Sequence, residues 1–501
     1  MGWQEFILSE DSTLVANNVV AERYGIYGTS VNVTDKCSCF IARDDNEKFL
    51  IVTGGTLFCE FEGSEVNVSG QIVKKCPLSN HNSTIIRSIF SYANPTSVGD
   101  RAASIGLGDR LGLASPGHVK LIKDRNVFPV LAQQSIRELN LTERTYQDVL
   151  AAAVWAVFQE GYKDGFGADG DHLKTVDEVK MALDCGFTMI TLDCSEYIDN
   201  DIESMESSEV SLIYKRIGES EIEYWESSYL DKTFKLGRGI SLDITRSDFI
   251  KVVMTYRKAL DFAEKVYNEI IKGLKKEVDF EISIDETLTA TSVTAHYVIA
   301  SEFWRRGIKI KNMAPRFCGE FQKGIDYKGS IDAFKKDFRI HCAIAKKFGY
   351  RISVHSGSDK FSIFPIVGEG TEGRFHIKTA GTNWLEAMRV IAIENPALFR
   401  RMYNHTLKRL PNAKKFYHIF TEPDVVPDID RFNDKELTSL LDIEESRQAL
   451  HITYGYLLCD KDETGRYIFR KEFFSTLHNF ESTYYEFLGK HIGRHLDCLS
   501  I

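Results

Sequence analysis

Residues 165–175 bring together side chains that can do acid–base and metal chemistry. A short, glycine-rich strand pattern ends in two aspartates, a histidine and a lysine: Asp169, Asp171, His172 and Lys174. A strand that ends on a carboxylate beside an imidazole presents a base and a metal ligand on one rigid support. The alternative is structural, because Asp171 or Thr175 could cap the helical pattern that follows, beside a structural histidine. We expect Asp171 and His172 to do chemistry.

A second strand pattern, 278–284, is followed by two carboxylates. Along it, apolar residues alternate with polar ones: Phe280, Ile282 and Ile284 against Glu281, Ser283 and Asp285. Because side chains alternate between the two faces of a strand, the polar set is expected to face the interior and Glu286 to begin the loop. One of Asp285 and Glu286 is expected to act in catalysis, and the pattern leaves open which one.

Histidines at two strand ends predict a metal site. His172 ends one strand pattern, and His355 follows the pattern 351–354. Two histidines with oxygen donors suit a divalent transition metal such as Ni, Co, Mn, Zn or Fe. We expect the third ligand to come from the loop 320–326, where Gln322 is our choice.

Cationic side chains near the same strand ends predict an anionic, hydroxylated substrate. The candidates for binding it are Lys174, Arg316 and Lys378. By alternation, Lys309, Lys311, His376 and Lys378 are expected to face inward on their strands. A buried ring of charges costs free energy unless it is paired or solvated, and an anionic ligand would pair it.

These groups meet only if the strands that carry them are neighbours in one parallel sheet. Eight strand patterns run along the chain: 105–113, 127–132, 165–170, 187–192, 278–284, 308–313, 351–354 and 375–378. Helical patterns lie between most of them: 145–158, 176–183, 248–274, 291–305, 331–348 and 384–393. Eight such alternations close a (β/α)8 barrel, whose active site lies at the carboxyl ends of the strands.

The barrel pattern has additions on either side. We predict an α/β protein with three parts: an N-terminal β-containing lobe over 1–100, a TIM-like (β/α)8 catalytic barrel over 101–410 and a mostly helical C-terminal extension over 411–501. The β-like runs of the lobe are Val19-Val20, 38–41, 49–53, 56–61 and 66–73. The charged, weakly periodic segment 195–239 is expected to be an insertion after the fourth strand.

The remaining histidines have structural interpretations. His341 falls on the apolar face of its predicted helix, and His296 is similar, so both are expected to be buried structural residues. In the tail, 417–420, 444–458 and 471–488 are expected to be helical elements packed on the barrel. His491 and His495 are expected to lie at a packed terminal helix end.

Composition excludes several classes of protein. The 501 residues are 43% hydrophobic and 27% charged, as in a soluble globular enzyme, and the net charge of −10 argues against binding nucleic acid or an anionic membrane surface. No apolar run approaches the ~20 residues of a membrane span, and the first residues lack a basic region before an apolar core, so we expect no secretory signal. The ten cysteines lack zinc-site spacing, so we expect a reduced, cytoplasmic protein.

Four motifs together resemble the bacterial tagaturonate/fructuronate epimerase family. They are Gly106-Leu107-Gly108-Asp109-Arg110-Leu111-Gly112, Gly170-Asp171-His172-Leu173-Lys174-Thr175, Asp285-Glu286-Thr287 and Val354-His355-Ser356-Gly357-Ser358-Asp359-Lys360. The tail, residues 484–495, is similar as well. The resemblance covers most of the chain from about residue 100 onward.

The resemblance implies a metal-dependent enzyme that interconverts two keto-hexuronates in hexuronate catabolism. It implies that Asp171 is the proton acceptor, that Glu286 is the proton donor, and that His172 and His355 are metal ligands, with Gln322 as a further one. The inverted carbon lies beyond the acidic α-position, which favours retro-aldol cleavage, rotation of the aldehyde and aldol closure. The rival functions are a metal-dependent sugar or uronate isomerase, a ketohexose 4-epimerase and an inert sugar-binding protein.

Overall fold

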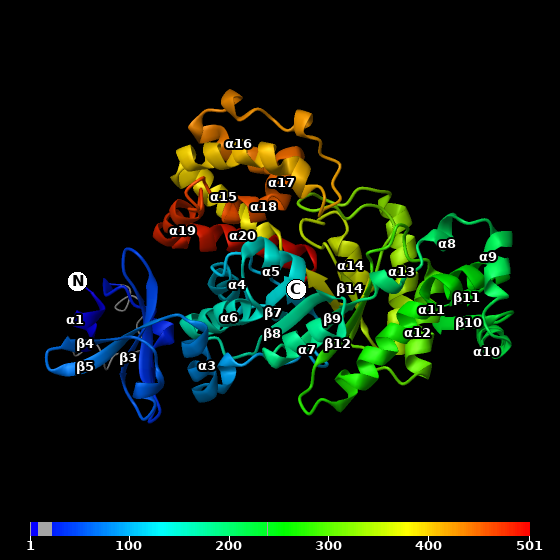
Figure 1. The fold of residues 1–501 in the computed structure, drawn as a ribbon, viewed down its shortest axis with the longest axis horizontal. Coiled ribbons are helices and arrows are strands. Elements are labelled where there is room, and N and C mark those ends of the chain that lie inside the picture. Colours follow the sequence, from blue (N-terminus) through cyan, green and yellow to red (C-terminus); the bar gives the residue numbers. More distant parts are fainter. Residues whose placement is uncertain (1, 9–22, 238) are drawn as a thin grey trace.

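Eight parallel strands close into a barrel at the centre of the molecule (Figure 1). The computed structural model describes residues 2–8, 23–237 and 239–501, so the run Val19-Val20 lies outside it. In barrel order the strands are β6 (Ser104–Gly106), β7 (Phe128–Ser135), β8 (Gly167–Leu173), β9 (Met189–Asp193), β12 (Asp279–Ile284), β13 (Asn312–Pro315), β14 (Arg351–Val354) and β15 (Phe375–Lys378). β15 pairs back onto β6, which confirms the predicted (β/α)8 barrel.

The sixth predicted strand is placed too early in the sequence. β13 begins only at Asn312, because the backbone N–H of Ile308 bonds to the carbonyl of Phe303 and so still belongs to the end of the preceding helix. Lys309 is therefore exposed, and Lys311 pairs with carboxylates outside the barrel. The prediction that these two lysines face inward is wrong.

Helices cover the outside of the barrel and connect its strands. They are α4 (Ser115–Ile122), α5 (Ile136–Thr142), α6 (Tyr146–Glu160), α7 (Val176–Asp184), α11 (Arg246–Glu269), α12 (Val293–Arg305), α13 (Ile331–Phe348), α14 (Phe364–Gly370) and α15 (Thr382–Glu394). Thr175 caps α7 in a capping box with Glu178. The cap is therefore Thr175, and the Asp171 side chain is directed elsewhere.

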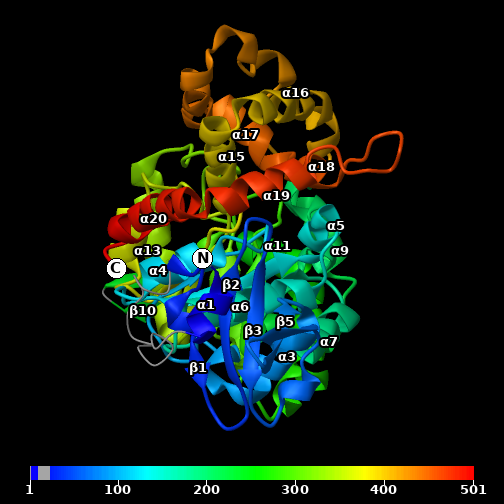
Figure 2. The same ribbon diagram turned by 90° about the vertical axis from the view of Figure 1, so that its left-hand side faces the viewer.

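The N-terminal lobe is an antiparallel sheet beside the barrel (Figure 2). Its order is β1 (Asn32–Val33), β2 (Ser38–Arg43), β3 (Lys48–Gly54), β5 (Gln71–Pro77) and β4 (Ser64–Val68). The run 56–61 is not a strand, because Phe58–Glu60 form a short 3-10 turn. The lobe rests against the barrel through α3 (Asn80–Ile89), which packs on α6.

A largely helical insertion separates β9 from α11, as predicted. It contains α8 (Asp201–Ser204), α9 (Ser207–Tyr214), α10 (Glu219–Tyr229) and the hairpin of β10 (Thr233–Gly237) and β11 (Ile240–Asp243). It lies at the end of the molecule opposite the N-terminal lobe (Figure 1).

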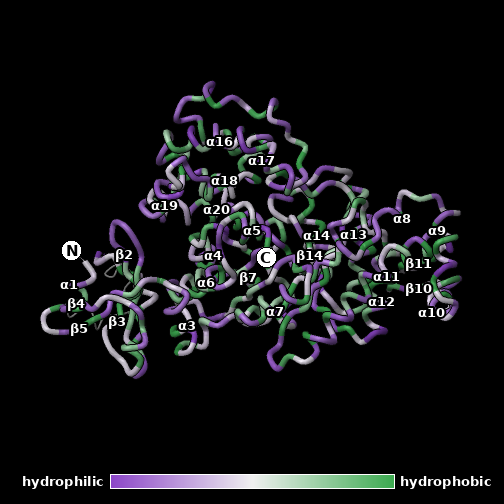
Figure 3. Tube along the Cα trace, in the orientation of Figure 1, coloured by the Kyte–Doolittle hydropathy of each residue, from purple (hydrophilic) through white to green (hydrophobic). Residues whose placement is uncertain are grey.

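The C-terminal helices build a second hydrophobic core above the barrel. After α16 (Pro396–Ala413) they are α17 (Glu444–Ile452), α18 (Tyr454–Cys459), α19 (Arg470–Asn479) and α20 (Glu481–Cys498). α15 and α16 share this core, while hydrophilic segments follow the outer loops (Figure 3). The residues 417–420 are not helical, in contrast to the prediction. Across the described ranges, each helix is too short or too polar to span a membrane.

Candidate active site

A bulge in β8 turns Asp171 and His172 toward each other at the barrel mouth. Between the paired positions Gly170–Ile190 and Leu173–Leu192, two residues of β8, Asp171 and His172, lie opposite the single residue Thr191 of β9, so β8 carries one extra residue. His172 adopts a left-handed backbone conformation there, with φ of 54°. In a regular strand these two neighbours would point to opposite faces. Instead, His172 Nδ1 lies 2.7 Å from Asp171 Oδ1.

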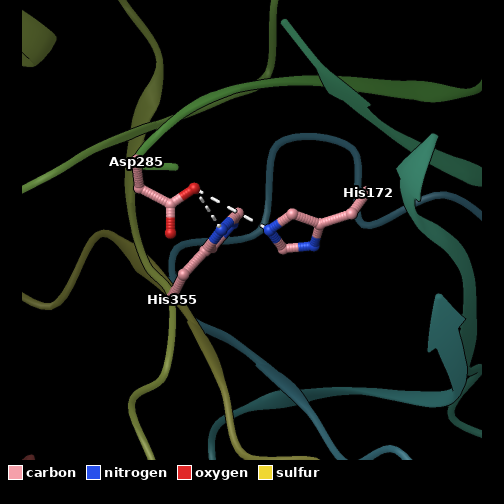
Figure 4. Close-up of side chains that lie close together, drawn as sticks. All are labelled: His172, Asp285 and His355. Carbon is pink, nitrogen blue, oxygen red and sulfur yellow. Dashed lines mark ion pairs between the residues drawn. The ribbon is translucent and has the colours of Figure 1, made fainter. Parts of the chain in front are cut away.

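Asp285 joins His172 and His355 in one compact group at the strand ends (Figure 4). One ligand atom from each residue lies within 4.8 Å of the other two. Asp285 Oδ1 is 3.2 Å from His355 Nδ1 and 3.7 Å from His172 Nε2. They come from β8, β12 and β14, which are the third, fifth and seventh strands of the barrel in chain order.

The surroundings of this group fit a divalent cation. Each histidine gives its other ring nitrogen to a carboxylate: His172 to Asp171, and His355 to Glu281 at 2.7 Å. This is the partner arrangement of metal-binding histidines, and it leaves His355 Nδ1 buried without a hydrogen bond to any described residue. The carboxylates of Asp169, Asp171 and Glu281 surround one ammonium, that of Lys378, and Asp285 adds a fourth carboxylate beside the two histidines, so carboxylates outnumber ammonium groups here. A bound cation would offset this excess.

Lys378 occupies the centre of the barrel interior, as alternation predicts. Its ammonium lies 2.9 Å from Asp169, 2.7 Å from Asp171 and 3.0 Å from Glu281. Burial lowers the pKa of Lys378, but these three carboxylates outweigh it and hold the pKa well above its ordinary value. Burial likewise opposes ionisation of Asp171, but His172 and Lys378 hold the pKa of that carboxyl well below its usual range. Asp171 is therefore an ionised carboxylate.

Asp285 and Glu286 occupy different environments. Asp285 faces the two histidines, whereas the Glu286 side chain is 37% exposed and lines the cavity at the strand ends. Lys174 lies 3.5 Å from Glu286 and 3.4 Å from Asp193, outside the cavity lining. Arg316 lines the cavity and donates a hydrogen bond to the carbonyl of Thr287.

Gln322 also lines the cavity, but its side-chain oxygen already accepts two hydrogen bonds from the protein. Oε1 accepts hydrogen bonds from the backbone N–H of Phe420 at 3.0 Å and from Gln448 Nε2 at 2.9 Å. To bind a metal, this oxygen would have to leave both donors. The assignment of Gln322 as a ligand stays a prediction, whereas Asp285 is already next to both histidines.

The cavity over these residues has a volume of about 650 Å³ and one wall from the C-terminal segment. Gln133, which the sequence offers as a residue to bind hydroxyls or to cap the next helix, lines this cavity. Sequence reasoning missed several other lining residues: Arg137, Lys323, Phe416, Tyr417, His418 and His451. Among these, Lys323 lies in the loop 320–326 that the sequence places at the strand ends. Nothing in the sequence pattern indicates that the residues after 410 reach the barrel mouth.

A second group of possible metal ligands, Asp359 with His491 and His495, has a structural role. Asp359 N–H donates to His495 Nε2 at 3.0 Å, and the other ring nitrogen of His495 lies 2.8 Å from the carbonyl of His491. Since both nitrogens of His495 are bound to protein, none remains for an ion. The group fastens α20 to the loop after β14, in line with the predicted packed helix end.

The buried pair His296 and His341 is structural too. Their Nδ1 atoms are 2.7 Å apart, and His296 Nε2 lies 2.6 Å from the hydroxyl of Tyr350. Both rings are fully buried between α12 and α13, away from the cavity, as the sequence predicts.

Comparisons with known proteins agree with this architecture. A family model described as tagaturonate epimerase matches residues 27–499. The tagaturonate/fructuronate epimerase of Thermotoga maritima is 39% identical over 488 residues, which cover 95% of this chain and 97% of that protein. Crystal structures of the fructuronate-tagaturonate epimerase UxaE from Cohnella laeviribosi, native and with glycerol, each superpose with a TM-score of 0.93 at 45% identity, covering 98% of this chain and 100% of theirs. The chain belongs to the tagaturonate epimerase family.

In this member of the tagaturonate epimerase family, a glycine makes room for a histidine of the C-terminal segment. His451 on α17 packs its ring against Gly381, where a Cβ atom would lie 1.8 Å from Nε2. The ring is 1% exposed, and neither of its nitrogens has a hydrogen-bond partner within the described ranges. Burial, with Arg110 and Lys323 nearby, holds the pKa of His451 well below its ordinary value, so the imidazole is neutral.

Replacing Gly381 with Ala should displace this ring. We expect the Gly381→Ala variant to lose about 1–3 kcal/mol of unfolding free energy, because the added methyl group overpacks a buried site. Thermal and urea unfolding measure the loss. Gly489→Ala is the matched control, since a Cβ there meets no atom within 4 Å, and it should be neutral or stabilising by up to ~1 kcal/mol. Equal stability of the two variants would contradict the packing described.

Proposed function

We propose that this protein is an epimerase that interconverts D-tagaturonate and D-fructuronate and that depends on a divalent metal. The observation that carries the proposal is the group of His172, Asp285 and His355 beside an ionised Asp171 at the mouth of the barrel. Family membership supports the reaction, because the relatives described above are named for these two substrates.

We assign the metal to His172, Asp285 and His355. Their carboxylate partners, Asp171 and Glu281, keep the free nitrogen of each imidazole turned toward the group. A divalent cation held there would supply Lewis-acid stabilisation of the negative charge that develops on substrate oxygens. We propose that the ion is one of the five metals that suit histidine and oxygen ligands: Ni, Co, Mn, Zn or Fe.

The reaction must invert a carbon that the ketone does not acidify directly. In our proposal Asp171 takes the proton of the hydroxyl on that carbon. The electron pair of the adjacent C–C bond moves toward the keto group as the hydroxyl carbon becomes an aldehyde. Rotation of the aldehyde and re-formation of the bond invert the carbon, and Glu286 returns a proton to the new alkoxide. In the reverse direction the two carboxylates exchange roles.

The three predicted substrate-binding cations have different surroundings. Lys378 is neutralised by its three carboxylates, so we assign it to holding Asp171 and Glu281 at the edge of the substrate site. We assign Lys174, whose ammonium lies 3.5 Å from Glu286, to orienting that carboxylate. Arg316 lines the cavity, and we assign it to contacts with substrate oxygens.

Turnover of D-tagaturonate tests the function directly. Protein stripped of metal by a chelator should form no fructuronate, as followed by NMR, and added divalent ions should restore it. The stripped protein should also unfold at lower temperature, because a ligand of the folded state stabilises it by mass action. Full activity after stripping would exclude metal dependence, and no turnover in any metal-loaded form would exclude the substrate pair.

Replacing Asp171 with Asn tests the base. The amide keeps an oxygen to accept from His172 but cannot take a proton at neutral pH. We expect kcat to fall by about 10²–10⁴-fold at saturating metal, with bound metal retained. Metal content by mass spectrometry accompanies the kinetics. A kcat near that of the wild type would remove Asp171 from the proton transfer.

Three further variants distinguish the possible oxygen ligands. Asp285→Asn should weaken metal binding about 100-fold or more, whereas Gln322→Met and Glu286→Gln should leave it within a few-fold of the wild type. Competition with a chelating dye measures the affinities. If Gln322→Met caused the large loss instead, the third ligand would be Gln322, as the sequence predicts.

A further inference from the structure

The cavity holds cationic side chains that lack the counterions found elsewhere in the site. Lys378 is neutralised by three carboxylates, and Arg110 lies 2.8 Å from Glu138. Lys323 and Arg137 line the same cavity, yet within the described ranges neither has a carboxylate at ion-pair distance. Arg316 shares this lack of a carboxylate, but it donates to the carbonyl of Thr287. Cations without counterions in one cavity indicate that the natural ligand brings negative charge.

The ammonium of Lys323 is held close to the proposed metal ligands. It lies on the loop after β13 and donates to Ser356 Oγ at 2.9 Å, the residue directly after His355. The buried ammonium of Lys360 fixes this loop by donating to the carbonyls of Gln322 and Ile325, at 2.9 and 2.6 Å. The position of Lys323 is therefore set by the fold. With one such contact for three N–H bonds, its ammonium has donors left for a ligand.

Arg137 approaches the cavity from the second position of α5. Its guanidinium stacks on Tyr417, 4.7 Å from the ring centre, and reaches the carbonyl of Phe416 with one long contact of 3.4 Å. Its Nε is buried and has no hydrogen-bond partner in the part of the chain that the structure describes. A guanidinium fixed on an aromatic ring with free N–H groups is suited to a carboxylate.

Residues that line the same cavity carry neutral polar atoms that lack hydrogen-bond partners among the described residues. His451 has two such ring nitrogens, and Gln133 Oε1 and Gln322 Nε2 are also buried and unpaired. An unsatisfied buried polar atom costs about 1–3 kcal/mol, so several around one cavity indicate a polar ligand that satisfies them. Burial holds the pKa of His451 well below its ordinary value, and Arg110 and Lys323 lower it further, so this imidazole lies in the neighbourhood of the same cations.

We propose that Lys323 and Arg137 bind the carboxylate of the hexuronate, with His451 as a neutral hydrogen-bond donor beside them. This inference rests on the proposed function and deepens it, because it names the residues that select a uronate over the neutral ketohexose. In the retro-aldol scheme the carboxylate belongs to the aldehyde fragment. Holding it by two cations lets the aldehyde rotate while the fragment stays in the cavity.

The binding preference for D-tagaturonate over D-tagatose tests the proposal. Calorimetry with metal-loaded protein measures both dissociation constants for the wild type and for Lys323→Met, which keeps a linear side chain but removes the charge. We expect the preference to fall about 10–100-fold in the variant, the range for losing a hydrogen bond to a charged group. Bound metal per chain should stay unchanged. Arg137→Gln should act in the same direction, which covers a failure of Lys323→Met to fold.

Arg316→Met is the matched control, since it removes another cation of the cavity wall. It should weaken both sugars alike and leave the preference within about twofold of the wild type. An unchanged preference in Lys323→Met and Arg137→Gln, or its loss in Arg316→Met alone, would overturn the inference.

If the preference depends on Lys323 but the wild type turns over neither sugar, the proposed function fails and the carboxylate site stands. If the wild type is an epimerase and its preference for tagaturonate is unchanged in Lys323→Met, the proposed function stands and the carboxylate site fails.

Discussion

The ammonium group of Lys378 contacts carboxylates from two strands, β8 and β12, at the centre of the barrel interior. Without it, Asp169, Asp171 and Glu281 would repel one another in a buried space. Two of these carboxylates then position histidines: Asp171 contacts His172, and Glu281 contacts His355. The orientation of both proposed ligands therefore depends on one buried cation, which replaces the apolar layers usual in such barrels.

Charge is distributed unevenly over the cavity. The strand ends carry more carboxylates than cations, which suits a metal ion, whereas Lys323 and Arg137 stand without counterions, which suits an anion. A keto-hexuronate has groups for both: neighbouring oxygens that can chelate a cation, and a carboxylate at its other end. One small molecule in this cavity could therefore bind a cation at the carboxylate-rich strand ends and also pair with the cations Lys323 and Arg137.

The C-terminal helices do more than cover the barrel. Helix α17 supplies His451 to the cavity, and its Gln448 holds the amide of Gln322. The non-helical segment before α17 supplies Tyr417. α20 fastens the loop after β14 through His495. Because that loop begins directly after His355, the extension helps to fix one of the proposed ligands. Removing these helices would take away part of the site itself.

Much of this arrangement follows from local sequence. Strand periodicity gives the boundaries of β14 and β15 and the inward direction of Glu281 and Lys378. The geometry of parallel strands gives the position of His172 and His355 at the rim of the barrel. Periodicity failed at β13, where the end of a helix extends into the predicted strand.

Only the tertiary structure decided the rest. The extra residue in β8 turns Asp171 and His172 to the same side, which alternation forbids. Contacts between strands place Asp285 against both histidines, and packing of the distant α17 brings His451 to the barrel mouth. Each depends on contacts between segments far apart in the chain, and such contacts leave no periodic trace in the sequence.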